Sequence, residues 1–138
     1  MDTNIISRLV RLGRVSSINI ENMSARVIWS DMDDSVSDEL PIVTPGCQKS
    51  KIYWMPEIDE QVVCLMLPNT SGKGSNDGFI IGSFFNEVDR PVKVGASIRR
   101  IDFGDGSFIQ HNRDTGNLDI FATGNITING KTVSINEP

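Results

Sequence analysis

The segment RDTGNLDIFATGNITINGKTVSI, residues 113–135, decides how the C-terminal part of this chain can fold. Its GNLDI at 116–120 returns as GNITI at 124–128, and the alternation resumes after a shift in register at Asn129 and Gly130. Apolar residues at every second position of a short strand fall on one face of that strand. The repeat therefore presents one apolar stripe, made of Leu118, Ile120, Ile126, Ile128, Val133 and Ile135.

Strands of so few residues cannot bury this stripe against one another within one chain. Each of these side chains gains roughly 1.5 to 3 kcal/mol when fully buried, so leaving all of them in water forfeits about 10 kcal/mol, comparable to the stability of a whole domain. Symmetric self-association is the least demanding way to cover the stripe. The alternative is that these strands fold back as hairpins on the preceding part of the chain.

Upstream of the repeat, IRRIDFGDGSFIQ at 98–110 predicts two strands around a turn at Asp105 and Gly106. A shift in composition at 90–96 separates this region from a first part that is rich in β-branched and aromatic residues. Five strands are expected in that first part, at residues 14–20, 25–29, 51–55, 61–67 and 78–85. The segment QVVCLML at 61–67 is apolar without alternation, which predicts a central strand covered on both faces.

Residues 1–12 place apolar side chains at roughly helical spacing before Gly13, which predicts a short N-terminal helix that ends there. Arg8 and Arg11 interrupt the apolar residues, so neither a signal-peptide core nor a membrane span is expected. We therefore expect synthesis in the bacterial cytoplasm. In that reducing compartment Cys47 and Cys64 are expected to remain free thiols.

The composition of the 138 residues is typical of a soluble β-rich protein with one domain and a small appendage. The formal net charge is -5, which on average repels the phosphate backbone of nucleic acids, so no nucleic-acid partner is expected. An aromatic platform for stacking bases normally lies in a positive groove. The aromatic residues of the first part are therefore expected to pack in its core: Trp29, Tyr53, Trp54 and Phe84.

The stretch DMDDSVSDELPIVTPG, residues 31–46, is rich in carboxylates, which are the ligands that calcium prefers. An EF-hand loop requires Gly at its sixth position and Glu at its twelfth, where this stretch has Val36 and Ile42. The GKG at 72–74 lacks the spacing of a phosphate-binding loop. We expect a solvated acidic loop, and we predict neither a metal site nor a cofactor.

Residues that would support an enzyme are scarce in this sequence. The single histidine, His111, has no recognisable nucleophile as a partner and is expected on the surface. The carboxylates of Glu57 and Glu60 have the chemistry for acid and base catalysis on sugars, but no residues remain to build the additional domain that such a hydrolase needs. No catalytic residue is therefore predicted.

Two segments carry a resemblance to a known family. YWMPEIDEQVVCLMLPN at 53–69 and DGFIIGSFFNEVDRP at 77–91 resemble the OB-fold region of the phage baseplate assembly protein V family, which type VI secretion spike proteins share. In that family, an aromatic residue and a proline precede a central strand, where an acidic residue is followed by Gln and Val. A later Gly-rich strand ends in Asn, and Pro follows it. The matching residues are Trp54, Pro56, Glu60, Gln61, Val62, Gly78, Gly82, Asn86 and Pro91.

The likeness continues beyond the barrel, because RIDFGDGSFIQHNRDTGNLDI at 100–120 resembles the family's transition from barrel to spike. Two departures stand out. Asp59 occupies a turn position where the family usually has Gly, although Asp tolerates left-handed backbone better than most residues. Many relatives end in a tip whose His-x-His residues hold iron, whereas this chain has only His111 and ends in VSINEP, so no metal is expected.

The resemblance implies an all-β fold: an N-terminal helix at 1–12, a five-stranded OB barrel at 13–93 and a short intertwined trimeric β-helical or β-prism spike at 94–138. It also implies a non-enzymatic central spike of a contractile phage tail, an R-type bacteriocin or a related injection device. Its partners would be two further copies of this chain, which complete the trimer, and a separate baseplate hub protein. If the C-terminus is a platform, a separate tip protein would bind there. Contact with the target cell envelope would be transient. The alternatives are an OB-fold nucleic-acid-binding protein and a subunit of a cell-wall-degrading enzyme.

Overall fold

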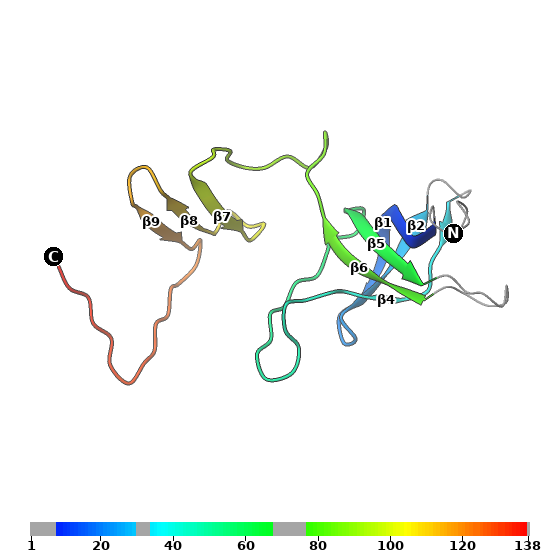
Figure 1. Ribbon diagram of the computed structural model, residues 1–138. Coiled ribbons are helices and arrows are strands. Elements are labelled where there is room, and N and C mark those ends of the chain that lie inside the picture. The colour runs from blue at the N-terminus through cyan, green and yellow to red at the C-terminus, as the bar shows by residue number, and fades with distance from the viewer. Residues whose placement is uncertain (1–7, 30–33, 68–76, 138) are drawn as a thin grey trace. The chain divides into compact units, whose positions relative to one another are not determined.

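The computed structural model describes residues 8–29, 34–67 and 77–137, and in these residues the fold is all-β with two antiparallel sheets (Figure 1). The expectation of an all-β fold is thereby confirmed. The chain divides into two compact units, Met1–Asn86 and Glu87–Pro138. Each unit contains one of the sheets and is described by itself.

The first sheet runs in the order β3-β2-β1-β5-β6, and β4 also pairs with β2. Its strands are β1 (Val10–Asn19), β2 (Ser24–Trp29), β3 (Ser35–Val36), β4 (Leu40–Pro41), β5 (Gln61–Leu67) and β6 (Asp77–Ser83). The strands predicted at 25–29, 61–67 and 78–85 are thus confirmed to within a few residues.

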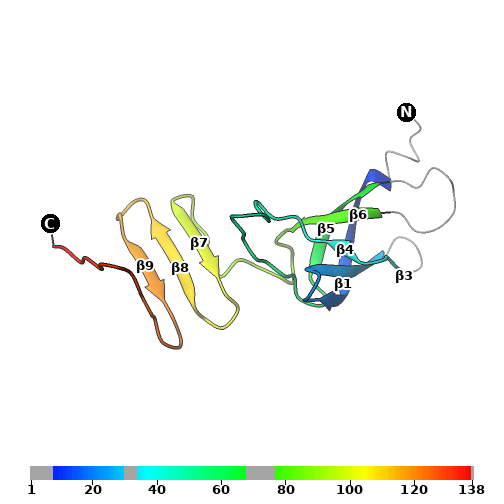
Figure 2. The ribbon, with the colours of Figure 1, turned by 90° about the horizontal axis from the view of Figure 1, so that it is seen from below.

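The first sheet curls because β1 takes part in both of its halves. Residues 10–14 of β1 pair with β5, residues 14–19 pair with β2, and a bulge lies between Val15 and Ser17. A bulge bends its strand and increases the local twist. On the far side, Ile42 just after β4 bridges Ile80 of β6 in parallel, and the backbone N–H of Val43 donates to the carbonyl of Ile80 at 2.9 Å. The two edges of the sheet therefore meet, as the neighbouring β4 and β6 in Figures 1 and 2 show.

The hydrophobic core lies inside this curl. It consists of Val15, Ala25, Val27, Trp29, Leu40, Ile42, Val62, Cys64, Met66 and Ile80. Alternate residues of β5, namely Val62, Cys64 and Met66, face inward. Burial raises the pKa of the Cys64 thiol to about 12, against a smaller opposite effect of the Arg11 guanidinium, so this thiol stays protonated. Cys47 and Cys64 are both free.

The predicted N-terminal helix does not extend to residue 12: Arg8 and Leu9 are helical, but Val10 and Leu12 lie in β1 and pair with Leu65 and Val63 of β5. Pairing with a central strand outweighs the local helical spacing of so few residues. Residues 1–7 lie outside the described part. The strand predicted at 51–55 is also wrong: Lys51 makes only an isolated bridge to Cys47, and the chain from 52 to 57 is irregular.

Two expectations about burial are wrong as well. The outer face of β5 is exposed to solvent, since Leu65 is 40% and Leu67 is 51% exposed. The sequence does not reveal this alternating burial, because both faces of the strand carry apolar residues. Among the aromatic residues of the first unit only Trp29 is in the core. The other three aromatic residues that were expected in the core are exposed: Tyr53, Trp54 and Phe84.

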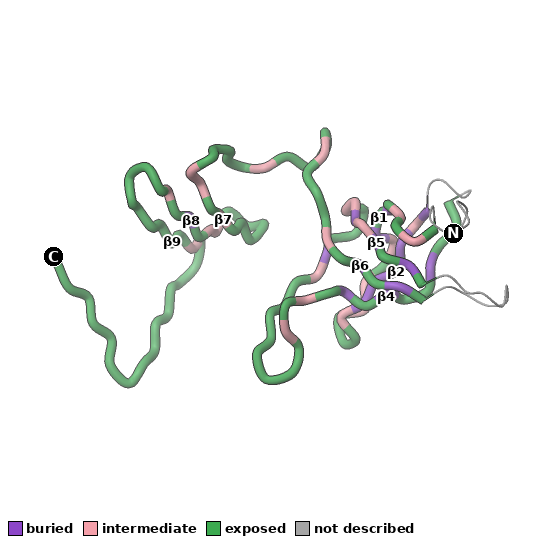
Figure 3. The backbone as a smooth tube through the Cα atoms, viewed as in Figure 1, coloured by how far each residue is buried: buried purple, intermediate pink, exposed green. Residues whose placement is uncertain are grey.

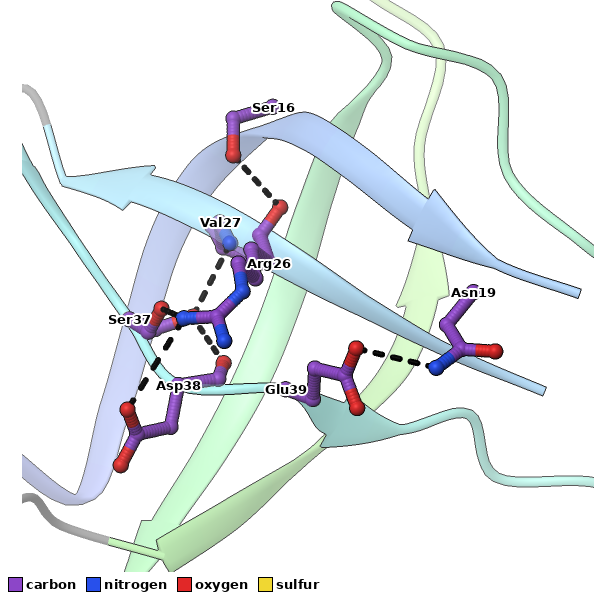
Figure 4. A network of polar contacts seen from close by, with 7 residues as sticks. All are labelled: Ser16, Asn19, Arg26, Val27, Ser37, Asp38 and Glu39. Carbon is purple, nitrogen blue, oxygen red and sulfur yellow. Dashed lines mark hydrogen bonds and ion pairs between the residues drawn. The ribbon is translucent and has the colours of Figure 1, made fainter. Parts of the chain in front are cut away.

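The described part of the acidic stretch is fastened to the first sheet through β3 and β4 (Figure 4). An Arg26 Nη1–H donates to the carbonyl of Ser37 at 3.2 Å, and this nitrogen lies 3.9 Å from a carboxylate oxygen of Asp38. Glu39 accepts a hydrogen bond from the Asn19 amide at 3.0 Å. Asp31 and Asp33 lie outside the described residues, within which no cluster of acids, histidines and cysteines has the arrangement of a metal site.

The second sheet contains β7 (Ile98–Asp102), β8 (Phe108–Asn112) and β9 (Leu118–Phe121) in the order β7-β8-β9. The hairpin predicted around Asp105 and Gly106 is confirmed as the β7–β8 connection. Gly104 and Gly106 have φ of 89° and 97° there, which glycine adopts without strain. The described residues after β9 contain no strand.

The turn before β5 explains the departure at Asp59. Asp59 has φ of 73°, in the left-handed region, and it lies between Glu57 and Glu60, whose backbone C=O and N–H close the turn at 3.1 Å. The N–H of Asp59 also donates to the carbonyl of Val15 at 2.8 Å, so the turn is tied to β1. Glycine is the residue best suited to this backbone conformation.

We therefore expect Asp59→Gly to stabilise the first unit by about 0.5 kcal/mol, because relief of a left-handed penalty of roughly 1 kcal/mol is partly offset by the greater entropy of glycine in the unfolded chain. Asp59→Ala, which keeps a β-carbon, is the control and should not stabilise. Chemical denaturation followed by tryptophan fluorescence measures both. A lower midpoint for the glycine variant would contradict this account of the turn.

Candidate functional site

The two faces of the second sheet differ sharply in composition. Directly opposed residues of antiparallel strands share a face, so the register assigns every side chain to one side. We call one side the apolar face, with Arg99, Ile101, Ile109, His111, Leu118 and Ile120. We call the other side the closed face, with Ile98, Arg100, Asp102, Phe108, Gln110, Asn112, Asp119 and Phe121.

The closed face is partly covered by its own side chains, with Phe121 still 51% exposed. The Arg100 Nε–H donates to the carboxylate of Asp102 at 2.8 Å, and the Nη1–H donates to the side-chain oxygen of Gln110 at 2.7 Å. The same guanidinium lies 3.9 Å from the centre of the Phe108 ring, which stacks on Phe121 at 5.6 Å. In this position the carboxylate and the ring offset the positive charge of the guanidinium, and the carboxylate and the amide oxygen accept hydrogen bonds from its N–H groups.

The apolar face has no such cover. Ile101, Ile109 and Ile120 form a row across all three strands and are 58%, 37% and 58% exposed. Two residues of the predicted stripe, Leu118 and Ile120, therefore share a surface with two isoleucines that the repeat did not reveal. A signal for them was present, because Ile101 and Ile109 lie symmetrically about Asp105 and a hairpin turning there places them opposite each other.

The second unit has no hydrophobic core of its own within the described residues. Every buried apolar side chain of the described chain belongs to the first unit, and the buried residue of the second unit is the polar Gln110, at 6% exposure. Folding a segment of this length loses backbone entropy of about 1 to 2 kcal/mol per residue, which buried apolar area normally offsets. Within its described residues, the second unit therefore buries little apolar area that could offset this loss.

The tail that follows β9 has the same deficit. Within the described residues, no hydrogen bond or strand pairing involves 124–137. The remaining four stripe residues lie here and all are exposed: Ile126, Ile128, Val133 and Ile135. Figure 3 shows this tail as an exposed, extended segment. Backbone N–H and C=O groups are normally paired when they are buried, so a covered tail would need partners for its backbone as well. The interface role of the six stripe residues stays a prediction.

Thr123 anchors the start of the tail to the β7–β8 turn. The Asp105 carboxylate accepts from the Ser107 backbone N–H at 2.9 Å and from the Thr123 hydroxyl at 3.1 Å. The backbone N–H of Thr123 donates to the Ser107 hydroxyl oxygen at 3.1 Å. These hydrogen bonds, first from the Ser107 backbone and then from the Ser107 and Thr123 side chains, lower the pKa of Asp105. The tail therefore leaves the sheet from a defined point.

Four of the residues that carry the family resemblance help to hold the first unit together. Pro56 and Val62 are fully buried. The Glu60 carboxylate accepts from the Glu57 backbone N–H at 2.9 Å, and the Glu60 carbonyl accepts from the N–H of Val15 at 3.0 Å. The Gln61 carbonyl accepts from the Ser83 hydroxyl at 2.9 Å. These contacts fix the start of β5 against β1 and β6.

The other five matching residues lie elsewhere. Gly78 and Gly82 are on β6, Asn86 ends the first unit, and Pro91 is half-buried in the second. Trp54 is exposed rather than packed in the core.

The comparisons with known proteins add no family. No protein-family model matches the chain, and no curated protein matches it. In the described ranges there is also no helix with the length and apolar character needed to cross a membrane.

The two glycines of β6 should respond oppositely to a methyl group. A β-carbon at Gly78 would lie 2.5 Å from the Met66 sulfur and 2.8 Å from the Leu65 carbonyl oxygen, whereas one at Gly82 would meet nothing within 4 Å. We expect Gly78→Ala to destabilise the first unit by about 2 kcal/mol and Gly82→Ala to leave it unchanged or slightly stabilised. Thermal unfolding tests this pair, and equal effects would contradict it.

The Asp105 anchor makes a defined pH dependence. The pKa of Asp105 is lower in the folded state than its ordinary value of 3.8, so this carboxylate stabilises the fold at pH values above 3.8. That contribution is lost as the pH falls through the lowered folded-state pKa. Between pH 6 and pH 2.5, wild type should therefore lose more stability than Asp105→Asn. Thermal unfolding of both proteins measures the difference, with Asp119→Asn as a control for removal of one carboxylate. Parallel pH curves for wild type and Asp105→Asn would rule out the anchor.

Proposed function

We propose that this chain is the central spike protein of a contractile phage tail or of a phage-tail-like particle such as an R-type bacteriocin, and that it works as a homotrimer without enzymatic chemistry. The observation that carries the proposal is the second unit, whose described residues show an open row of isoleucines and an unpaired tail but no hydrophobic core. Such a unit becomes stable when identical units cover one another.

Self-association through the apolar face follows from its composition, and the number of subunits follows from the family resemblance. Three copies with their apolar faces turned inward form a prism in which each second sheet makes one side. The stripe of the tail then continues the same interior as an intertwined β spike over residues 94–138. A sandwich of two sheets would also cover the face, so the mass of the assembly separates the two arrangements.

The first unit supports the same proposal as a barrel of the OB type. Three observations support this part of the proposal: β1 pairs with both β2 and β5, β6 adds to β5, and Ile42 bridges Ile80 in parallel. A small closed Greek-key barrel would have such connections. Nucleic-acid binding is less well supported, because the chain has a formal net charge of -5 and platforms that stack bases normally lie in a positive groove.

The outer face of the barrel is a candidate docking surface for the separate hub protein. Val10, Leu65 and Phe79 form a row across β1, β5 and β6, and all three are exposed although the core beneath them is complete. An uncharged apolar patch that folding does not require is typical of a surface that another protein covers. In this proposal the barrel binds the hub, and the spike contacts the target cell envelope.

The mechanical role needs stiffness more than chemistry. Sheath contraction pushes the hub, and the trimeric spike transmits that push to the envelope through hydrogen-bonded strands. A prism closed on itself also leaves fewer open strand edges, which protects the spike from edge-to-edge aggregation. The C-terminus is either the tip itself or the platform on which a separate tip protein sits.

The proposal predicts a particle of three times the 15.2 kDa chain mass in light scattering. Ile109→Asp and Ile128→Asp should each weaken the trimer, raising its dissociation constant at least about 100-fold, because symmetry brings three carboxylates into an apolar interior. Val94→Asp, an equivalent change at an exposed site before β7, is the matched control and should leave the trimer intact.

Circular dichroism of the same variants shows whether the first unit remains folded, so that loss of the trimer is not mistaken for global unfolding. A wild-type monomer or dimer would overturn the proposed homotrimer. A trimer that Ile109→Asp and Ile128→Asp leave as intact as Val94→Asp does would show that the apolar face and tail are not its interface.

A further inference from the structure

The polar groups of the apolar face are all basic. Next to the isoleucine row lies a second cross-strand row in which Arg99 opposes His111 and His111 opposes Leu118. The acids within the strands of this sheet, Asp102 and Asp119, belong to the closed face. Arg99 and His111 therefore border an apolar layer with no carboxylate beside them on the same face.

Arg99 lacks the neighbouring carboxylate that Arg100 has within the described residues. Its Nη1–H groups donate to the backbone carbonyls of Ala96 at 3.1 Å and Ile98 at 3.0 Å, which satisfies donors but supplies no counter-charge. Within the described residues no carboxylate forms an ion pair with Arg99, and the exposed His111 side chain makes no hydrogen bond. Arg100, by contrast, pairs with Asp102.

In the proposed trimer this arrangement creates a charge problem, and the following step rests on that proposed function. If three apolar faces turn inward, three copies of Arg99 and three of His111 converge at one level of the axis. Like charges brought together in a poorly solvated interior repel strongly, and an unpaired buried charge is costly. None of the three faces carries an acid that could offset this repulsion.

We infer that the trimer binds an oxyanion on its axis, between the three copies of Arg99 and His111. A guanidinium matches the oxygens of phosphate or sulfate with two parallel N–H donors, and an imidazole adds a further donor. A tetrahedral oxyanion has a three-fold axis of its own, so it makes equal contacts with three symmetric chains. The bound anion replaces the repulsion between these basic side chains with contacts that link the three subunits.

The test uses the full-length trimer and inorganic phosphate as the probe. Trimer dissociation is measured by sedimentation with increasing phosphate in place of chloride at constant ionic strength. For wild type, the apparent dissociation constant should fall at least about tenfold in a saturable way, as expected for a ligand that binds only the assembled state. Arg99→Gln should be insensitive to phosphate, and it should form a tighter trimer than wild type when phosphate is absent.

Arg113→Gln is the matched control, because it removes the same charge from an exposed turn of the same unit that is not on the apolar face. It should respond to phosphate as wild type does. If the wild-type trimer persists but wild type, Arg99→Gln and Arg113→Gln respond equally to phosphate, the axial site is refuted while the proposed spike stands. If wild type is monomeric in both salts, the proposed function itself fails and the anion site fails with it.

Discussion

A β-sheet has two faces, and the second sheet of this chain covers only one of them with its own side chains. Arg100 closes that face by joining Asp102, Gln110 and Phe108 in one matched cluster. The opposite face exposes three isoleucines in a row, and the tail beyond it leaves its backbone unpaired within the described residues. Because about 25 cal/mol is gained for each Å² of apolar surface removed from water, this surface is the strongest drive toward association in the unit.

The first unit solves the same problem within one chain. The bulge in β1 and the bridge from Ile42 to Ile80 curl its sheet until the inner face encloses a core of its own. Its turns and glycines serve that curvature: Asp59 takes a left-handed conformation before β5, and Gly78 leaves room for Met66. In the proposed spike, the first unit folds on its own core and binds the hub, and the second sheet assembles with its copies.

The sequence predicted the features that local chemistry decides. The Asp105–Gly106 turn and the positions of β2, β5 and β6 follow from turn residues and β-branched runs. The errors arose where tertiary pairing overrides local pattern, as at Val10 and Leu12, whose helical spacing yields to pairing with β5. Within the candidate site, the repeat identified Leu118 and Ile120, but Ile101 became part of the same surface only through the register of β7 on β8.

The central claim is that the second sheet folds only when other copies cover it, and hydrogen exchange at different protein concentrations tests this most directly. Amides of β7–β9 should be protected at high concentration and should lose that protection on dilution, because their folding is coupled to assembly. Amides of β1 and β5 should stay protected throughout. If β7–β9 kept the same protection at every concentration, the sheet would be stable in a single chain and the account would be wrong.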